Sequence, residues 1–241
     1  MYLLRKIYLF LLFSLVVIIA QESHAQARST VFVLSTLHQF HSDSSFYSFT
    51  TLSNIVRDLK PDVICVELTP TDLASRKEQK TKQEYPKSIF PLADKYGYRM
   101  VPMEPGEPLF TELVGLTRQS ERELRENHPD KAEAFSIFTE ELYKQLFAQW
   151  DSVLAINSQI TDSNFEVKHR YQNALFGAKQ EGAWEEWNKH FLQTIVDTAQ
   201  KYKGKRIVVL VGVEHAYWLR ARLRTEKSIR LKVSSDFLKK M

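Results

Sequence analysis

Three apolar runs of seven or eight residues constrain the fold more than any other feature of the sequence. They are residues 30–37 (TVFVLSTL), 62–68 (DVICVEL) and 206–212 (RIVVLVG). Each run is rich in β-branched residues and almost continuously apolar, which is typical of strands that are covered on both faces. Two shorter runs, at residues 99–103 and 229–233, predict two further strands. The chain is therefore predicted to form a sheet buried between two layers.

Helical patterns separate these strands. Apolar residues recur at steps of three and four over residues 49–59, and Pro61 follows as a stop signal. Residues 89–98 predict another helix, which Gly97 ends. The alternation of strand and helix from residue 30 to residue 103 is typical of parallel sheets. The predicted fold class is α/β, a layered and largely parallel sheet with helices on both faces.

Residues 108–203 differ from the rest because they carry no strand signal. Aromatic and aliphatic residues repeat there at steps of three and four, which predicts about four amphipathic helices. The chain returns to the sheet at Arg206. A chain of 241 residues is accounted for by a single domain with an insertion. We therefore predict one α/β domain over residues 26–241, in which residues 108–203 form a helical insertion that caps one end of the sheet.

The first residues have the three-part layout of a secretory signal peptide. Arg5 and Lys6 precede an apolar run at residues 7–20, and small residues at positions 23, 25 and 27 offer cleavage sites. The run has 14 residues, fewer than the roughly 20 that span a bilayer, which argues against the alternative of a retained membrane anchor. We predict a signal peptide over residues 1–25 and export to a periplasm or the extracellular space, without stable membrane insertion after cleavage.

Composition excludes several classes of protein. The single cysteine, Cys65, excludes a disulfide scaffold, and its place in an apolar strand predicts a buried, unreactive thiol. An apolar fraction of 44% excludes a disordered chain. A net charge of +4 without a long basic run argues against nucleic-acid binding. The expected partner is a small-molecule or peptide substrate, and the sequence leaves the oligomeric state open.

Polar residues follow four of the predicted strands at the point where each strand ends. These residues are His38, Glu67, Glu104 and His215. Because function gathers at the carboxyl ends of parallel strands, the four side chains are expected to lie at one edge of the sheet. Two imidazoles and two carboxylates there favour either a divalent metal with an activated water or a metal-free acid–base pair. Gly212, just before His215, is predicted to allow a sharp turn.

Other polar residues are expected to have lesser roles. His41 and Glu214 are expected to support the site or to face solvent. His128, His169 and His190 stand in polar helical contexts and are predicted to lie at the surface.

The order of the strand-end motifs resembles the TraB/TIKI family, within the superfamily that contains erythromycin esterase and the haem-binding lipoprotein ChaN. The segments that carry the resemblance are residues 35–38 (STLH), 61–68 (PDVICVEL), 98–104 (YRMVPME) and 208–215 (VVLVGVEH). Two positions depart from the family pattern. Ser35 stands where the family has the glycine of Gly-x-x-His, and Trp187 precedes Asn188 where TraB/TIKI members have an arginine.

The resemblance implies an exported hydrolase-like protein that acts on peptide or ester bonds. His38, Glu67 and His215 would bind a divalent metal (Zn, Mn or Co), or the histidines would shuttle protons while Glu67 activates water. Glu104 and Asn188 would support these residues. The similarity to ChaN implies an alternative, a binding protein for haem or iron that uses the same histidines. A regulatory relative without activity is a third hypothesis.

Overall fold

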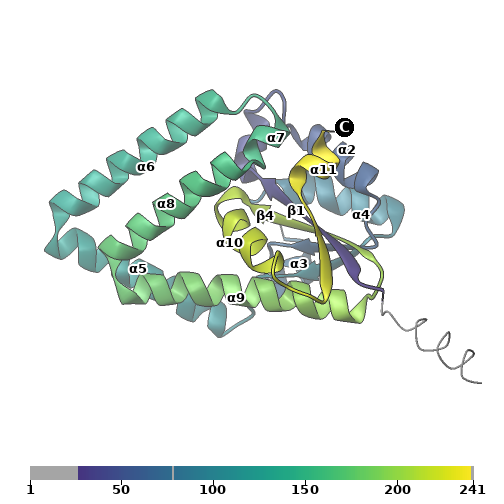
Figure 1. The fold of residues 1–241 in the computed structure, drawn as a ribbon. Helices are drawn as coiled ribbons and strands as arrows, with labels where there is room; N and C mark the ends of the chain where they lie inside the picture. The colour runs from purple at the N-terminus through teal and green to yellow at the C-terminus, as the bar shows by residue number, and fades with distance from the viewer. Residues whose placement is uncertain (1–26, 78, 240–241) are drawn as a thin grey trace, which may run out of the picture.

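The computed structural model describes residues 27–77 and 79–239, and at its centre lies a sheet of five parallel strands in the order β3-β2-β4-β1-β5 (Figure 1). The strands are β1 (Ser29–Thr36), β2 (Val63–Val66), β3 (Arg99–Pro102), β4 (Arg206–Gly212) and β5 (Ile229–Lys232). The predicted α/β class is confirmed, and each of these strands lies within two residues of its expected bounds. The predicted signal peptide lies outside the described residues.

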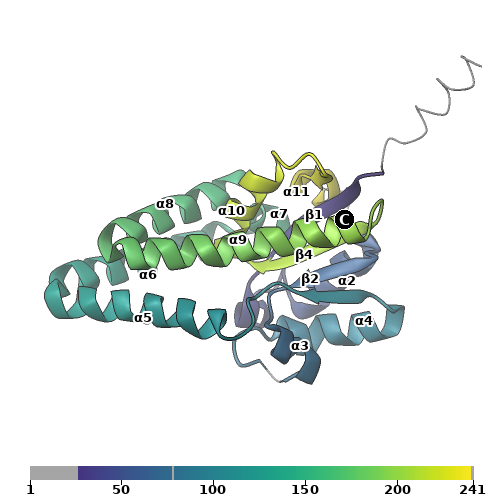
Figure 2. The ribbon, with the colours of Figure 1, turned by 90° about the horizontal axis from the view of Figure 1, so that it is seen from below.

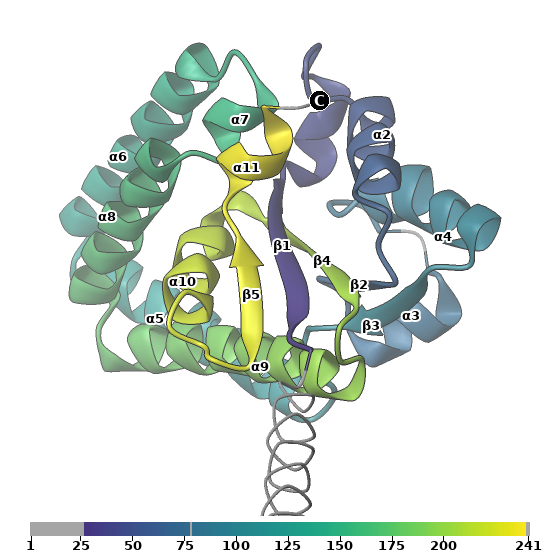
Figure 3. The ribbon, with the colours of Figure 1, turned by 45° about the vertical axis from the view of Figure 1, so that its right-hand side comes forward.

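The sheet is covered on both faces, which explains why its strands are continuously apolar. Along β4, Val208 and Leu210 enter one core, whereas Ile207 and Val209 enter the other. Helices α2 and α4 lie on one side of the sheet, and α9 and α10 on the other (Figure 3). The bounds of these helices are α2 (Phe49–Leu59), α4 (Phe90–Tyr96), α9 (Ala178–Lys201) and α10 (Val213–Leu223). Cys65 is fully buried in the second core, and burial raises the pKa of its thiol to about 12, as expected of an unreactive cysteine.

Local sequence explains where the helices begin and end. Ser48 caps the start of α2 by accepting a backbone hydrogen bond, and Lys60 ends this helix in the left-handed conformation. Gly97 ends α4 in the same way, with a φ of 72°. The helical backbone starts earlier than residue 89, because a π-helix (η2, Tyr85–Ile89) runs directly into α4. Short π-helical segments are frequent near functional sites.

Residues 108–203, all of which the structure describes, form helices and contain no strand. The helices are α5 (Leu109–Asn127), α6 (Pro129–Gln149), α7 (Val153–Ile156), α8 (Gln159–Phe176) and α9. Helices α5, α6 and α8 project past the sheet on the side where the strands end, and α9 runs back along the sheet (Figures 1 and 2). The helical insertion therefore lies beside the strand ends.

The remaining elements are short. They are η1 (His38–Ser42), α3 (Pro70–Ser75) and α11 (Ser234–Leu238). Among the helices in the described part of the chain, none has both the length and the apolar character needed to cross a membrane.

The register of the sheet aligns the ends of three strands. Thr36 at the end of β1 pairs with Gly212 at the end of β4, and Val66 at the end of β2 pairs with Leu210. Residues that directly follow these strands are therefore neighbours at one edge of the sheet.

Candidate active site

The ends of β1, β2 and β4 bring His38, Glu67 and Gly212 together. The Gly212 N–H donates a hydrogen bond of 2.6 Å to Glu67 Oε2, and His38 Nε2 lies 3.7 Å from Glu67 Oε1. The chain passes directly from β4 into α10 at Gly212, as expected, but the φ of −52° is open to any residue, so this turn does not itself require glycine. A side chain at this position would place its Cβ atom 2.5 Å from His38 Nε2. Glycine is needed because the imidazole lies directly against the backbone.

We expect Gly212→Ala to displace the His38 imidazole and to lower the free energy of unfolding by about 1–3 kcal/mol, as overpacking does in other cores. Urea titration measures the stability, and the NMR signals of the His38 ring report the displacement. Gly115→Ala in α5 is the matched control, because a Cβ atom there meets nothing within 4 Å among the described residues. Equal stabilities for Gly212→Ala and the native protein, with an unshifted His38 ring, would refute the steric explanation.

His38 is held by a strained backbone and by a carboxylate. Its φ is 51°, which is uncommon for a residue that has a side chain. Its Nδ1 lies 2.8 Å from Glu84 Oε1, which also accepts a hydrogen bond from the Thr36 hydroxyl. Burial lowers the pKa of His38, but the carboxylates of Glu67 and Glu84 outweigh this effect and raise the pKa above 6.5. The imidazolium form of His38 is therefore favoured.

Residues 82–85, which no sequence motif marks, supply further contacts to the strand ends. Lys82 Nζ lies 2.5 Å from Glu104 Oε1 and 3.2 Å from Glu67 Oε1. The Tyr85 hydroxyl accepts a hydrogen bond from the Glu67 N–H and donates one to a carbonyl of β4. Lys82 and Glu84 belong to a polar stretch at residues 76–84 (RKEQKTKQE), and Tyr85 follows it. Nothing in this stretch distinguishes the residues that reach the site from their neighbours.

The two carboxylates beside Lys82 differ in acidity. Burial raises the pKa of Glu67, but Lys82, His38 and His215 outweigh this effect and bring the pKa down to about 2. The pKa of Glu104 rises to about 7, because burial and the Glu67 charge outweigh the attraction of Lys82. Glu67 is therefore ionised at neutral pH, whereas Glu104 titrates there. Glu104 contacts Lys82, which in turn contacts Glu67.

His215 lies in the first turn of α10 and is oriented by Asn188 of α9. Its Nδ1 lies 2.9 Å from Asn188 Oδ1, and Asn188 Nδ2 donates to the Trp184 carbonyl, which fixes the amide oxygen toward the imidazole. His215 Nδ1 therefore carries the proton, and Nε2 is left as an acceptor. Removal from solvent lowers the pKa of His215 to about 4. His215 is neutral at physiological pH.

Glu214 faces a second set of polar side chains, on the helical insertion. Its Oε2 lies 2.7 Å from Lys168 Nζ and 3.0 Å from His169 Nε2, and its Oε1 accepts a hydrogen bond from the Tyr143 hydroxyl. Burial raises the pKa of Glu214, but Lys168 and His169 hold it well below its usual range. His169 is only 2% exposed and stacks on Trp184, so the prediction that it lies at the surface is wrong.

Two further residues from the sequence motifs lie beneath the site. His41 is 1% exposed; its Nδ1 lies 2.6 Å from the Tyr47 carbonyl, and its Nε2 accepts a hydrogen bond from the Leu37 N–H. It supports the loop after β1 and does not face solvent. Ser35 is also buried, and its hydroxyl accepts a hydrogen bond of 2.9 Å from Arg220. The departure from glycine at this position is thus part of a buried polar network.

A cavity of about 180 Å³ joins the candidate residues. Its polar side is formed by Thr36, His38, Glu67, Gly212, Glu214 and His215. Its apolar side is formed mainly by four aromatic residues, Phe40, Tyr143, Phe147 and Trp150, of which the last three belong to or directly follow α6. A second cavity, of about 230 Å³, adjoins the first at Glu214 and His215 and extends along α8 and α9. The helical insertion thus supplies one wall of the site.

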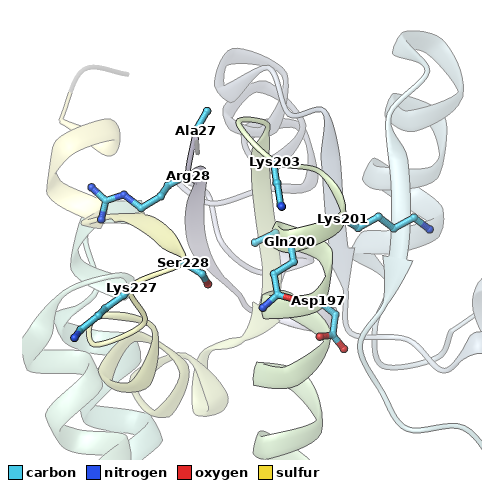
Figure 4. Close-up of a pocket in the computed structure, with 9 residues that line it drawn as sticks. Ala27, Arg28, Asp197, Gln200, Lys201, Lys203, Lys227 and Ser228 are labelled. Atoms are coloured by element: carbon cyan, nitrogen blue, oxygen red, sulfur yellow. The ribbon is translucent and has the colours of Figure 1, made fainter. Parts of the chain in front are cut away.

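A larger hollow, of about 790 Å³, lies at the opposite end of the sheet, where β1 begins (Figure 4). Its rim is mostly basic, with Arg28, Lys201, Lys203 and Lys227 beside Asp197. Among the described residues it has none in common with the strand-end site. It is therefore separate from the candidate chemistry despite its size.

The strand-end residues, as they are arranged, do not fit the predicted metal site. Within residues 27–77 and 79–239, no group of three or more His, Cys, Asp or Glu side chains has the geometry to hold a metal ion. The ammonium group of Lys82 lies against the Glu67 oxygen that a cation would need, and His38 Nδ1 is engaged by Glu84. A divalent metal and haem both stay predictions, and no step proposed below depends on either.

Comparisons with known proteins do not assign the chain to a family. No family model, no curated protein and no solved structure was found to match it. The resemblance to the TraB/TIKI family therefore stays a prediction from the motifs, and the functional argument rests on the geometry of the strand ends.

Proposed function

We propose that the protein is a metal-independent hydrolase in which His215 is the general base and His38 the general acid. The observation that carries the proposal is that the two imidazoles line one cavity but have opposite partners. His215 Nδ1 faces the neutral amide oxygen of Asn188, whereas His38 Nδ1 faces the carboxylate of Glu84. Two titratable groups whose surroundings separate their pKa values are suited to act as an acid–base pair.

In the proposed reaction, a water molecule attacks the carbonyl carbon of an ester or amide. His215 Nε2 accepts a proton from this water as the new C–O bond forms. The His38 imidazolium donates its Nε2 proton to the leaving oxygen or nitrogen as the scissile bond breaks. The two histidines have then exchanged charge states, and proton transfer through solvent restores the starting state.

Glu67 is proposed to stabilise positive charge on both imidazoles rather than to activate water. With a pKa of about 2 it is a weak base, and its oxygens already contact Lys82 and the Gly212 N–H. Its charge raises the pKa of both His38 and His215. It therefore favours the His215 imidazolium that forms when water is deprotonated.

The sequence motifs support the same class of reaction. They resemble a family whose members include hydrolases of peptide and ester bonds, and the leader predicted at residues 1–25 supports an exported enzyme. The test therefore uses both an ester and an amide as substrates.

The test is the pH dependence of kcat/KM for p-nitrophenyl acetate and for an acetylated peptide amide, measured with and without EDTA. The rate is expected to rise through about pH 4, because His215 must lose its proton to act as a base. For the amide, whose nitrogen must be protonated to leave, the rate is expected to fall again above pH 6.5, where His38 loses the proton that it must donate. EDTA is expected to leave the profile unchanged.

Two variants make this test specific. His38→Gln is expected to abolish the alkaline limb of the profile, and His128→Ala, at an exposed position, is expected to leave both limbs in place. A rate of amide hydrolysis that keeps rising at alkaline pH would contradict a cationic acid. If EDTA abolishes the activity and Zn²⁺ or Mn²⁺ restores it, the metal-dependent hypothesis replaces this one.

A further inference from the structure

The aromatic side of the 180 Å³ cavity is a continuous surface that the proposed acid–base chemistry does not use. We name it the aromatic wall, and it consists of Phe40, Tyr143, Phe147 and Trp150. The Phe147 ring lies at its centre, with ring centroids 5.4 Å from Phe40, 6.2 Å from Tyr143 and 5.2 Å from Trp150. The wall thus joins the loop after β1 to α6, and it lines the same cavity as His38 and His215.

Two of the rings are exposed although they form part of this packed cluster. Phe40 is 42% exposed and Phe147 is 40% exposed, whereas Trp150 behind them is 5% exposed. Exposed apolar side chains that are contiguous, and that line a cavity with a few polar groups, mark a ligand site. Here the polar groups that line the same cavity are the candidate catalytic ones.

The volume and charge of the cavity restrict what the aromatic wall can bind. A cavity of roughly 150 Å³ is enough for one benzene molecule, so about 180 Å³ admits one ring or a short alkyl chain. The charged groups on the polar side already have partners: Glu67 lies beside His38 and Lys82, and Glu214 beside Lys168. A neutral apolar group therefore fits this space better than a charged one.

We propose that the aromatic wall binds the apolar acyl group of the substrate, so that the preferred substrates are esters or amides of small, neutral, apolar acids. This inference rests on the proposed hydrolase function. The acyl group lies on the wall, and its carbonyl carbon faces His215 and His38, which line the same cavity. Phe147 and Phe40 are specificity-determining residues for the acyl group, and they take no part in proton transfer.

Binding is tested first, with probes that are not turned over on the timescale of the titration. The inactive variant His215→Asn is titrated with benzamide and with acetamide, and the indole N–H signal of Trp150 is followed by NMR. Benzamide is expected to bind at least about tenfold more tightly than acetamide, because its ring is removed from water on the wall. Benzoate, which has the same ring with a negative charge, is expected to bind more weakly than benzamide.

Variants of the wall identify where the ring binds. Phe147→Ala is expected to weaken benzamide binding roughly five- to tenfold and to leave acetamide binding unchanged, whereas Phe147→Leu keeps part of the preference. Tyr96→Ala, which removes an exposed ring outside the cavity, is the control. Phe40 and Phe147 are about 40% exposed, so their replacement is expected to leave the circular dichroism spectrum unchanged.

The active protein gives a second readout. Across p-nitrophenyl acetate, butyrate, hexanoate and decanoate, kcat/KM is expected to peak at butyrate or hexanoate, and Phe147→Ala is expected to remove that peak. If binding follows the expected order but no ester or amide is hydrolysed, the hydrolase proposal fails and the apolar site remains. Equal binding of benzamide and acetamide overturns the inference. The inference is also overturned if sedimentation shows that Phe147→Ala converts a dimer to a monomer, because the wall would then be an interface between two copies.

Discussion

Replacing His215 by asparagine is expected to lower kcat on p-nitrophenyl acetate by roughly 10²–10⁴-fold, which is the usual contribution of one general base. The shorter amide side chain keeps an N–H donor near the position of Nδ1, so that the contact with Asn188 Oδ1, now 2.9 Å, can persist. It lacks the Nε2 atom that accepts the proton. KM is expected to change little, because the aromatic wall is intact. A loss in kcat without a change in KM places His215 in the chemical step.

His128→Asn, the same substitution at an exposed histidine, is the control for this variant. Asn188→Asp tests the assignment through the pKa of His215. A carboxylate in place of the amide favours the imidazolium, so the acid limb of the pH profile is expected to move upward from about pH 4. Activity of His215→Asn within twofold of the native value would show that another group is the base. An acid limb that stays in place in Asn188→Asp would show that His215 does not control it.

The sheet, and the edge where its strands end, could be predicted because both depend on the pattern of apolar residues along the chain. The run at residues 206–212 is apolar at every inner position, and such runs form strands covered on both faces. Once the strands are parallel, their ends coincide, and the residues after β1 and β2 must be neighbours. The sequence therefore predicts that His38 and Glu67 lie at one edge, and His38 Nε2 lies 3.7 Å from Glu67 Oε1.

The partners of these residues could not be predicted, because they come from segments whose local pattern resembles ordinary surface. Lys82 stands among other lysines, and only the path of the chain into the π-helix, fixed by the Tyr85 hydroxyl, brings it to Glu67. His169 has polar neighbours along α8 and reads as exposed. The inner face of α8 is polar because it packs around Glu214, a buried acid from a different part of the chain. An amphipathic pattern assigns such a face to solvent.

Gly212 is a further residue whose role depends on a distant contact that the local sequence does not reveal. A glycine after a strand is usually interpreted as a turn, yet its backbone conformation here is open to other residues. What excludes a side chain is the imidazole of His38, 174 positions earlier in the chain, and no local pattern reports that contact.

The largest loss of stability is expected from Lys82→Met, which removes the ammonium group that two buried carboxylates share. Lys82 Nζ lies 2.5 Å from Glu104 Oε1 and 3.2 Å from Glu67 Oε1, and both acids are at most 6% exposed. Removal of one partner from a buried ion pair typically costs roughly 3–5 kcal/mol, because the remaining charge is left uncompensated. Methionine has a similar length and shape, so the loss is electrostatic and not one of packing. Urea titration near pH 8 measures it.

The pH dependence of this loss identifies its cause. Without the ammonium group, the pKa of Glu67 rises from about 2, and the pKa of Glu104 rises further above the value near 4.5 that a glutamate has in the unfolded chain. The folded variant then binds more protons than the unfolded one, so its stability falls as the pH rises above 4.5. The difference from the native protein is expected to be smaller near pH 4.5 and largest above pH 7.

Lys80→Met, in the same loop and exposed, removes the same charge and is expected to change the stability by less than about 0.5 kcal/mol. Adding Glu104→Gln to Lys82→Met removes one of the two carboxylates and is expected to recover part of the loss at pH 8. A loss that does not depend on pH, or that Glu104→Gln does not relieve, would mean that Lys82 acts through packing. The low pKa of Glu67, on which the acid–base assignment depends, would then need an explanation other than the charge of Lys82.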